Sequence, residues 1–158
     1  MTLRRLTWLW LFLLLPGCQT PLQKGAAQPQ GKAVVAGYLE DILNGDRWET
    51  YDQYFAPQVL FNGALIGKSD LQRRVASFRS AYPDFHVTIE DQIAEGDGVV
   101  TRMMCTGTHL GPDLGVPATG VKVKFTGIAI DRIRDGKVVE MWFLGDVWSR
   151  MQQIRSDL

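Results

Sequence analysis

Asp146 is the residue of this chain best placed to carry out acid/base chemistry. It ends a run of β-branched and aromatic residues that follows a turn at residues 134–137. In an extended strand, Trp142 and Leu144 share its parity and would point to the same face. Apolar neighbours raise the pKa of a carboxylic acid towards neutrality, where it can both accept and return a proton. Asp is also a preferred N-cap residue, so Asp146 is either a catalytic group or the cap of a helix beginning at Val147.

A second carboxylate, Glu140, shares the parity of Asp146. It lies about 20 Å away along the strand, at roughly 3.3 Å per residue. That places it close to the turn, where Gly136 can adopt the positive φ of a tight hairpin. Glu140 is therefore expected at the solvated end of the strand, away from the candidate site.

The elements that must position Asp146 follow from the hydrophobic periodicity. Apolar residues at helical spacing predict helices over Ala33–Asn44, Asp46–Phe55, Asp70–Ala81 and Val147–Ile154. Alternating patterns predict a brief strand at Val59–Gly63 and then long strands over Phe85–Ile93, Val99–His109, Val121–Ile133 and the stretch Gly136–Trp148. Helices followed by an antiparallel meander indicate an α+β fold. Strands of this length twist, so the curved antiparallel sheet should pack on the N-terminal helices as a cone with an internal pocket.

Several other side chains were weighed for a functional role. The short second helix carries four aromatic residues, of which Trp48 and Tyr51 are candidate substrate contacts; packing of this helix against the sheet is the alternative. Asp131 is interpreted as a residue of the sheet surface or a turn. Cys105 is interpreted as a small core residue, because nothing near it favours a thiolate.

The N-terminus has the build of an export signal. Arg4 and Arg5 precede an apolar run over residues 6–15, which is too short to span a bilayer at about 20 residues per crossing. The end of this run, residues 15–18 (Leu-Pro-Gly-Cys), resembles a bacterial lipobox, which implies cleavage after Gly17 and lipidation of Cys18. Residues 1–17 are thus the expected signal peptide, 18–32 the lipidated Cys and a flexible tether, and 33–158 the domain. The expected location is the cell envelope.

Composition excludes several classes of function. Removing Arg4 and Arg5 leaves 15 of the 17 basic residues against 17 acidic ones, so the mature chain carries about −2. It has no basic run with interleaved aromatic residues, which argues against nucleic acid as a partner. If Cys18 is lipidated, Cys105 has no partner within the chain; with two His in all, no metal site is expected.

Four motifs together resemble the SnoaL-like polyketide cyclase family, also called ester cyclases. They are Tyr-Pro-Asp-Phe at 82–85, Gly-Thr-His-Leu-Gly at 107–111, Pro-Ala-Thr-Gly at 117–120 and the stretch 135–146. The similarity covers about Ala33 to Ile154. It implies the cone fold of nuclear-transport-factor-like proteins, a fold that hosts enzymes of several classes as well as binding modules.

The resemblance also implies a chemistry and the residues that perform it. Members of the family close a ring by intramolecular aldol condensation, with neither metal nor cofactor, and a pocket Asp serves as acid and base. Asp146 matches that Asp, and His109 matches its polar partner, which could stabilise the developing alkoxide. Asn62 is a weaker third match. Two hypotheses remain open: a cofactor-free enzyme acting on a carbonyl compound, or a membrane-tethered module that binds a small hydrophobic ligand. A homodimer through the sheet is a further possibility.

Overall fold

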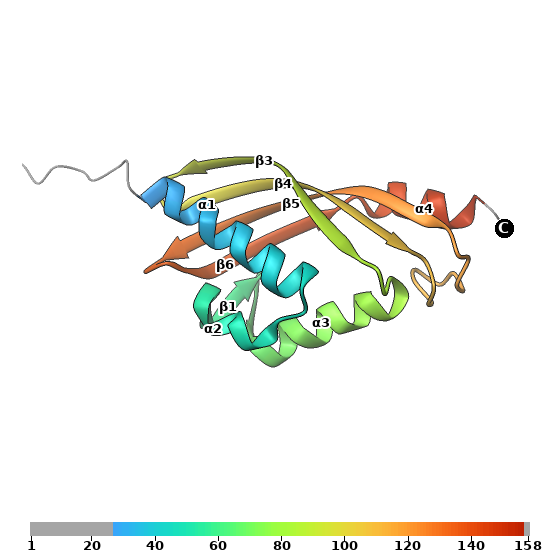
Figure 1. Cartoon of the computed structure of the whole chain (residues 1–158), viewed down its shortest axis with the longest axis horizontal. Helices are drawn as coiled ribbons and strands as arrows, with labels where there is room; N and C mark the ends of the chain where they lie inside the picture. Colours follow the sequence, from blue (N-terminus) through green and yellow to red (C-terminus); the bar gives the residue numbers. More distant parts are fainter. Residues whose placement is uncertain (1–26, 157–158) are drawn as a thin grey trace, which may run out of the picture.

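The computed structural model of this protein describes residues 27–156 as helices covering one face of a curved sheet (Figure 1). The helical segments are α1 (Ala27–Tyr38), the π-helical turn η1 (Leu39–Asn44), the 3-10 turn η2 (Trp48–Thr50), α2 (Tyr51–Tyr54), α3 (Lys68–Ala81) and α4 (Val147–Arg155). The strands are β1 (Phe55–Phe61), β2 (Ala64–Gly67), β3 (His86–Glu95), β4 (Gly98–Thr108), β5 (Lys122–Arg134) and β6 (Lys137–Gly145). The predicted α+β fold is confirmed.

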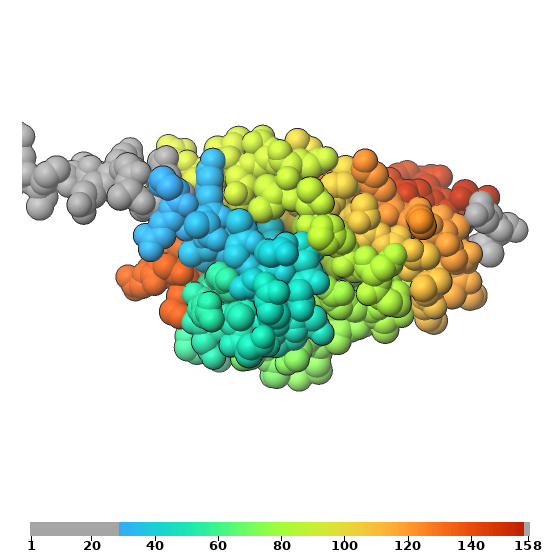
Figure 2. Space-filling view, in the orientation of Figure 1, coloured from blue at the N-terminus to red at the C-terminus, as the bar shows by residue number. Residues whose placement is uncertain are grey.

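The six strands form one open sheet in the order β2-β1-β6-β5-β4-β3. All neighbours are antiparallel except β1 and β6, which run parallel, so the sheet is mixed and not purely antiparallel as predicted. The long strands β3 to β6 bend over α1 and α3, while α4 lies beside the far end of β5 (Figure 1). In the space-filling view, the helical surface runs without a break from α1 to α3 (Figure 2). The concave face of the sheet is therefore covered by helices.

Two hairpins set the register of the long strands, and one of them is the turn predicted at Gly136. Gly96 takes φ of 61° in the turn between β3 and β4. Asp135 and Gly136, between β5 and β6, have φ of 50° and 73°. Positive φ at both central residues gives a turn whose twist matches that of the flanking strands. The first turn aligns β3 with β4, and the second aligns β5 with β6.

The helices differ from the sequence prediction at their ends. The first begins at Ala27, before the predicted Ala33, and continues into η1. Asp46 forms no capping box with Glu49; it has φ of 54°, and its carboxylate accepts the indole N–H of Trp48 at 2.7 Å. The third helix begins at Lys68, because the Asp70 carboxylate accepts the backbone N–H of Gly67 at 3.1 Å.

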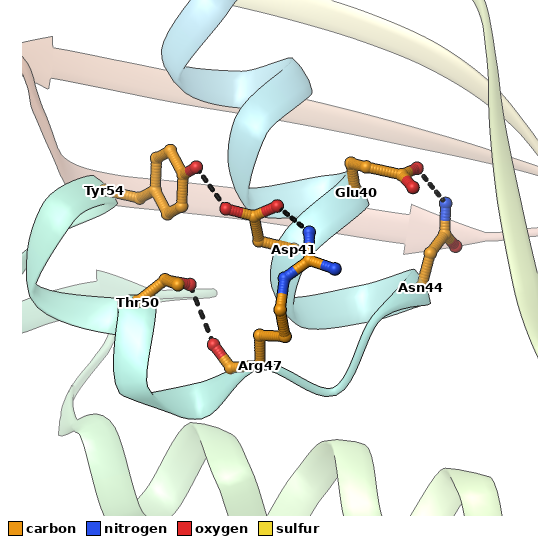
Figure 3. A network of polar contacts seen from close by, with 6 residues as sticks. All are labelled: Glu40, Asp41, Asn44, Arg47, Thr50 and Tyr54. Carbon is orange, nitrogen blue, oxygen red and sulfur yellow. Dashed lines mark hydrogen bonds and ion pairs between the residues drawn. The ribbon is translucent and has the colours of Figure 1, made fainter.

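A polar network connects the segments of the helical layer to one another (Figure 3). The carboxylate of Asp41 accepts hydrogen bonds from the Arg47 guanidinium and the Tyr54 hydroxyl. The side chain of Asn44 bonds both backbone groups of Val87 on β3, at 3.0 Å and 2.8 Å. Because this amide pairs with the edge of β3, it fixes η1 over the sheet.

One irregularity in β6 decides which side chains face the helices. Arg132 pairs with Glu140, whereas Ile133 pairs with Val138, so Val139 is an extra residue on β6. A bulge of this kind shifts every later side chain to the opposite face. Val138 and Met141 are both buried although their parities differ.

The predicted signal peptide, Cys18 and most of the predicted tether lie outside the described residues. Within residues 27–156, no helix is both long and apolar enough to cross a bilayer.

Candidate functional site

A cavity of about 410 Å³ lies between the concave face of the sheet and the helices. This volume is within the range of small-molecule sites in proteins, roughly 300–1,000 Å³. Its walls come from α1, η1, α3, α4 and strands β1 and β4 to β6, and most of the lining side chains are aliphatic or aromatic: Leu39, Ile42, Leu43, Phe55, Phe61, Leu71, Val75, Phe78, Phe85, Met103, Phe125, Ala129, Met141, Phe143, Leu144 and Val147. Tyr38, Arg74 and Arg150 are the polar side chains of the lining. Such a cavity suits a small, mostly apolar molecule.

Arg150 is held rigidly in the wall of this cavity. Its guanidinium lies over the rings of Phe78 and Phe125, at 5.0 and 5.1 Å from their centroids. Its Nε forms an ion pair with the Asp113 carboxylate at 3.1 Å. Aromatic faces attract a cation, so this buried charge has compensating partners. Arg150 is one of two cationic side chains, with Arg74, in a mostly apolar wall.

Tyr38 and Asp131 form a buried pair that the sequence interpretation missed. The Tyr38 hydroxyl lies 3.2 and 3.4 Å from the two carboxylate oxygens of Asp131, and the carboxyl is fully buried. Burial raises the pKa of Asp131 to about 7, against a smaller opposing effect of the Tyr38 bond. Burial and Asp131 raise the pKa of Tyr38 well above its usual range. The assignment of Asp131 to the sheet surface or a turn is therefore wrong; it shares the parity of the buried Phe125 and Ala129, and that alternation could have identified it.

Asp146 caps the final helix. Its carboxylate accepts the backbone N–H of Ser149 at 2.8 Å, and α4 begins at the next residue. The side chain is exposed and is not part of the cavity lining, although the flanking Gly145 and Val147 are. The predicted cap is confirmed, and a catalytic role of Asp146 at the cavity rim stays a prediction.

Two substitutions of Asp146 separate these roles. Asp146→Ala removes the cap and should lower the free energy of unfolding by about 1 kcal/mol, whereas Asp146→Asn keeps a good cap and should change it little. Urea denaturation of both variants measures the difference. A carboxylate that acts as acid and base would lose turnover in both variants; equal stability of Asp146→Ala and wild type would contradict the cap.

His109 is not brought together with Asp146 in the cavity. Its ring is fully buried, packs against Tyr82 at 5.4 Å between ring centroids, and bonds Thr119 Oγ1 through Nδ1 at 3.0 Å. Nε2 has no hydrogen-bond partner among residues 27–156. His109 is the first residue of the loop that joins β4 to β5, and it is not part of the cavity lining.

Of the two β6 residues predicted to face the pocket, Leu144 is part of the cavity lining and Trp142 is not. Trp142 is 46% exposed on the convex face, where its indole N–H donates to Glu140 at 2.6 Å. Leu144 is 75% exposed and contributes only to the cavity rim. The bulge at Val139 instead turns Met141 and Phe143 inwards.

The remaining candidate residues also lie outside the cavity lining. Asn62 sits in the β1–β2 turn and bonds both backbone groups of Phe143, at 3.1 and 2.8 Å. Trp48 and Tyr51 are buried, with Tyr51 stacked on Phe55 at 4.8 Å. These contacts are structural, as the packing alternative predicts for the aromatic helix.

The side chains of the described residues do not favour metal binding or thiol chemistry. No group of three or more His, Cys, Asp or Glu side chains there is arranged to hold a metal ion. Cys105 is buried, which raises the pKa of its thiol to about 12. The thiol is a core group, as predicted.

Comparisons with known proteins place the fold and the family. A candidate polyketide cyclase from Acidithiobacillus ferrooxidans is 26% identical, with a TM-score of 0.73 over 82% of this chain and 96% of that one. IdmH, a candidate polyketide cyclase from Streptomyces antibioticus, is 27% identical, with a TM-score of 0.72 over 79% and 98%. No curated protein sequence matches the chain. The family model for SnoaL-like polyketide cyclases matches residues 33–154. The chain belongs to the SnoaL-like polyketide cyclase family.

Proposed function

We propose that this protein binds a small, mostly apolar carbonyl compound in the cavity beneath the sheet. The observation that carries the proposal is the lining itself, which is aliphatic and aromatic apart from Tyr38, Arg74 and Arg150. Apolar walls supply affinity, and a few placed polar groups fix orientation. Membership of a family named for polyketide cyclases supports a carbonyl-containing ligand.

Cofactor-free acid/base catalysis, such as an intramolecular aldol-type cyclisation, is the second candidate function. Family membership favours it. The geometry favours binding, because neither Asp146 nor His109 lines the cavity and a general base must reach the proton that it removes. Turnover of a carbonyl substrate, lost in Asp146→Asn while binding persists, would establish the catalytic function.

Filling the cavity tests the proposed binding. Ala129→Phe places a ring in the cavity from β5, whereas Ile128→Phe, one residue earlier, adds the same ring to the exposed convex face. We expect the affinity for 2-acetylnaphthalene to fall by about tenfold or more in Ala129→Phe, a change of about 1.4 kcal/mol, and to stay near wild type in Ile128→Phe. Isothermal titration measures both, and circular dichroism confirms folding. Equal affinity in folded Ala129→Phe and wild type would place the ligand elsewhere.

We also propose that the domain is tethered to a membrane through a lipid on Cys18. The support is the sequence of residues 15–18 and the polar, Pro- and Gly-containing segment that follows. Expression of the full chain and of Cys18→Ser tests this: wild type should fractionate with membranes, and the variant should not. Identical fractionation would exclude the anchor.

A homodimer through the sheet is supported by a row of exposed apolar residues on the convex face. Ile93, Val100, Ile130 and Trp142 are paired in register across β3 to β6, and each is more than a third exposed. A two-fold axis would place this row against its own copy. Sedimentation of wild type and Ile130→Glu tests the contact; a monomeric wild type would rule it out.

A further inference from the structure

The Tyr38–Asp131 pair is short of hydrogen-bond donors. Both carboxyl oxygens of Asp131 face the single hydroxyl of Tyr38, at 3.4 and 3.2 Å. An ionised carboxylate only accepts hydrogen bonds, whereas a protonated one also donates one. A fully buried carboxylate with one weak donor is poorly stabilised, so the neutral carboxyl is the form that suits this position.

The elements packed around Asp131 bring no compensating charge to it. Its register partners are Val99 on β4 and Met141 on β6, and neither titrates. From α1 it meets the Tyr38 hydroxyl, while Lys32 of that helix donates to the carbonyl oxygen of Gln92 at 2.6 Å. The neighbouring cations of β5, Arg132 and Arg134, are exposed and pair with Asp97. Burial and the Tyr38 bond are the influences on its pKa.

Tyr38 connects this pair to the cavity. It belongs to the cavity lining, whereas Asp131 does not. The nearby wall positions, Ala129 and Met141, are apolar. Among the polar side chains of the lining, Tyr38, Arg74 and Arg150, only the Tyr38 hydroxyl can both accept a hydrogen bond and donate one to a ligand oxygen.

We propose that Tyr38 and Asp131 form the carbonyl-recognition end of the cavity. The protonated Asp131 carboxyl donates its hydrogen to the Tyr38 hydroxyl oxygen, and the hydroxyl hydrogen is then free to bond the carbonyl oxygen of the ligand. This assignment rests on the proposed ligand binding and adds the group that recognises the ligand. Tyr38 touches the ligand, and Asp131 acts through it as a positioning residue.

The arrangement makes carbonyl recognition depend on pH. Burial raises the pKa of Asp131 to about 7, so both protonation states are populated near neutrality. When Asp131 is ionised, its carboxylate accepts the single hydroxyl hydrogen of Tyr38. The ligand oxygen then has no hydrogen-bond donor at this position. The preference for a carbonyl ligand is therefore present at about pH 5.5 and weak at about pH 8.5.

Two probes of matched shape test the proposal. 2-Acetylnaphthalene carries the carbonyl, and 2-ethylnaphthalene replaces it with an apolar group of similar size. At low pH, the wild type should bind the ketone roughly fivefold better than the hydrocarbon, the value of about one net hydrogen bond. Tyr38→Phe should lose this preference at every pH. Asp131→Asn should keep it at every pH, because the amide N–H can donate to the Tyr38 oxygen whatever the pH.

The outcomes separate the two proposals. If neither probe binds the wild type, the proposed binding function fails. If both bind but Tyr38→Phe keeps the ketone preference, the binding function stands and the recognition role is overturned. A preference in the wild type that does not change with pH would overturn the role of Asp131. A purely structural role of the pair would change the affinity for both probes alike.

Discussion

The free energy of unfolding of the wild-type protein is expected to fall, relative to that of Asp131→Asn, by on the order of 4 kcal/mol between about pH 4 and pH 8. In the unfolded chain, the Asp131 carboxyl titrates near its ordinary pKa of 3.8, whereas in the folded protein burial raises that pKa to about 7. Each tenfold difference in proton affinity is worth about 1.4 kcal/mol, which sets the size of the effect.

The direction follows from the number of protons that each state binds. Between pH 3.8 and about 7, the folded protein holds the Asp131 proton and the unfolded chain has released it. Raising the pH therefore favours unfolding across this window. The contribution of Asp131 to stability is fully present below about pH 4 and is lost as the pH rises through the folded-state pKa. Above that pKa, both states are ionised and the dependence ends.

Urea denaturation of both proteins at a series of pH values measures this effect. The comparison with Asp131→Asn is needed because Asp41, Asp84 and Asp97 have lowered pKa values and contribute in the opposite direction. Asp97→Asn is a suitable control, since the Arg132 guanidinium holds the Asp97 pKa below its usual range. If the difference between wild type and Asp131→Asn stays constant with pH, the Asp131 carboxyl reaches water in the folded protein.

Local patterns in the sequence were sufficient for the fold. Hydrophobic alternation located the four long strands, and Gly136 marked the hairpin between β5 and β6 because its backbone position requires positive φ. The cap at Asp146 was equally local, since it depends on a side chain and a backbone N–H three residues later. Features set within a few residues of each other can be inferred without a structure.

The site depended on features that no local pattern reveals. The bulge at Val139 arises from pairing between β5 and β6, and after it Met141 and Phe143, rather than Trp142, lie in the cavity wall on the side of Val138. The role of Asp131 depends on its hydrogen bond with Tyr38, which lies far away in the sequence on α1. A charged residue in a strand indicates a solvated face, but Asp131 is buried because helix α1 covers it.

Gly111 is the position where adding a methyl group should do the most damage. A Cβ there would lie 2.3 Å from the carbonyl oxygen of Ser80 and 3.0 Å from the Cα of Ala81, at the end of α3. Both are backbone atoms, so no side-chain rotation relieves the contact. The loop would have to move away and give up two hydrogen bonds to the Ala81 carbonyl, from Leu110 N–H at 2.9 Å and Gly111 N–H at 3.1 Å.

We expect Gly111→Ala to lower the free energy of unfolding by roughly 3 kcal/mol, through overpacking and the loss of these bonds. Gly67→Ala, at the other end of α3, is the matched control: its Cβ would meet nothing closer than 3.8 Å, and its cost should stay below about 1 kcal/mol. Urea midpoints measure both; similar losses in the two variants would show that the loop can move away from α3 at little cost.

Displacement of this loop should also affect the cavity wall. Asp113 of the loop pairs with Arg150 and accepts a hydrogen bond from the Tyr82 hydroxyl at 2.8 Å, so moving the loop also loosens the Arg150 guanidinium. The affinity for 2-acetylnaphthalene should therefore fall in Gly111→Ala and be retained in Gly67→Ala, which links the packing of this loop to the binding site.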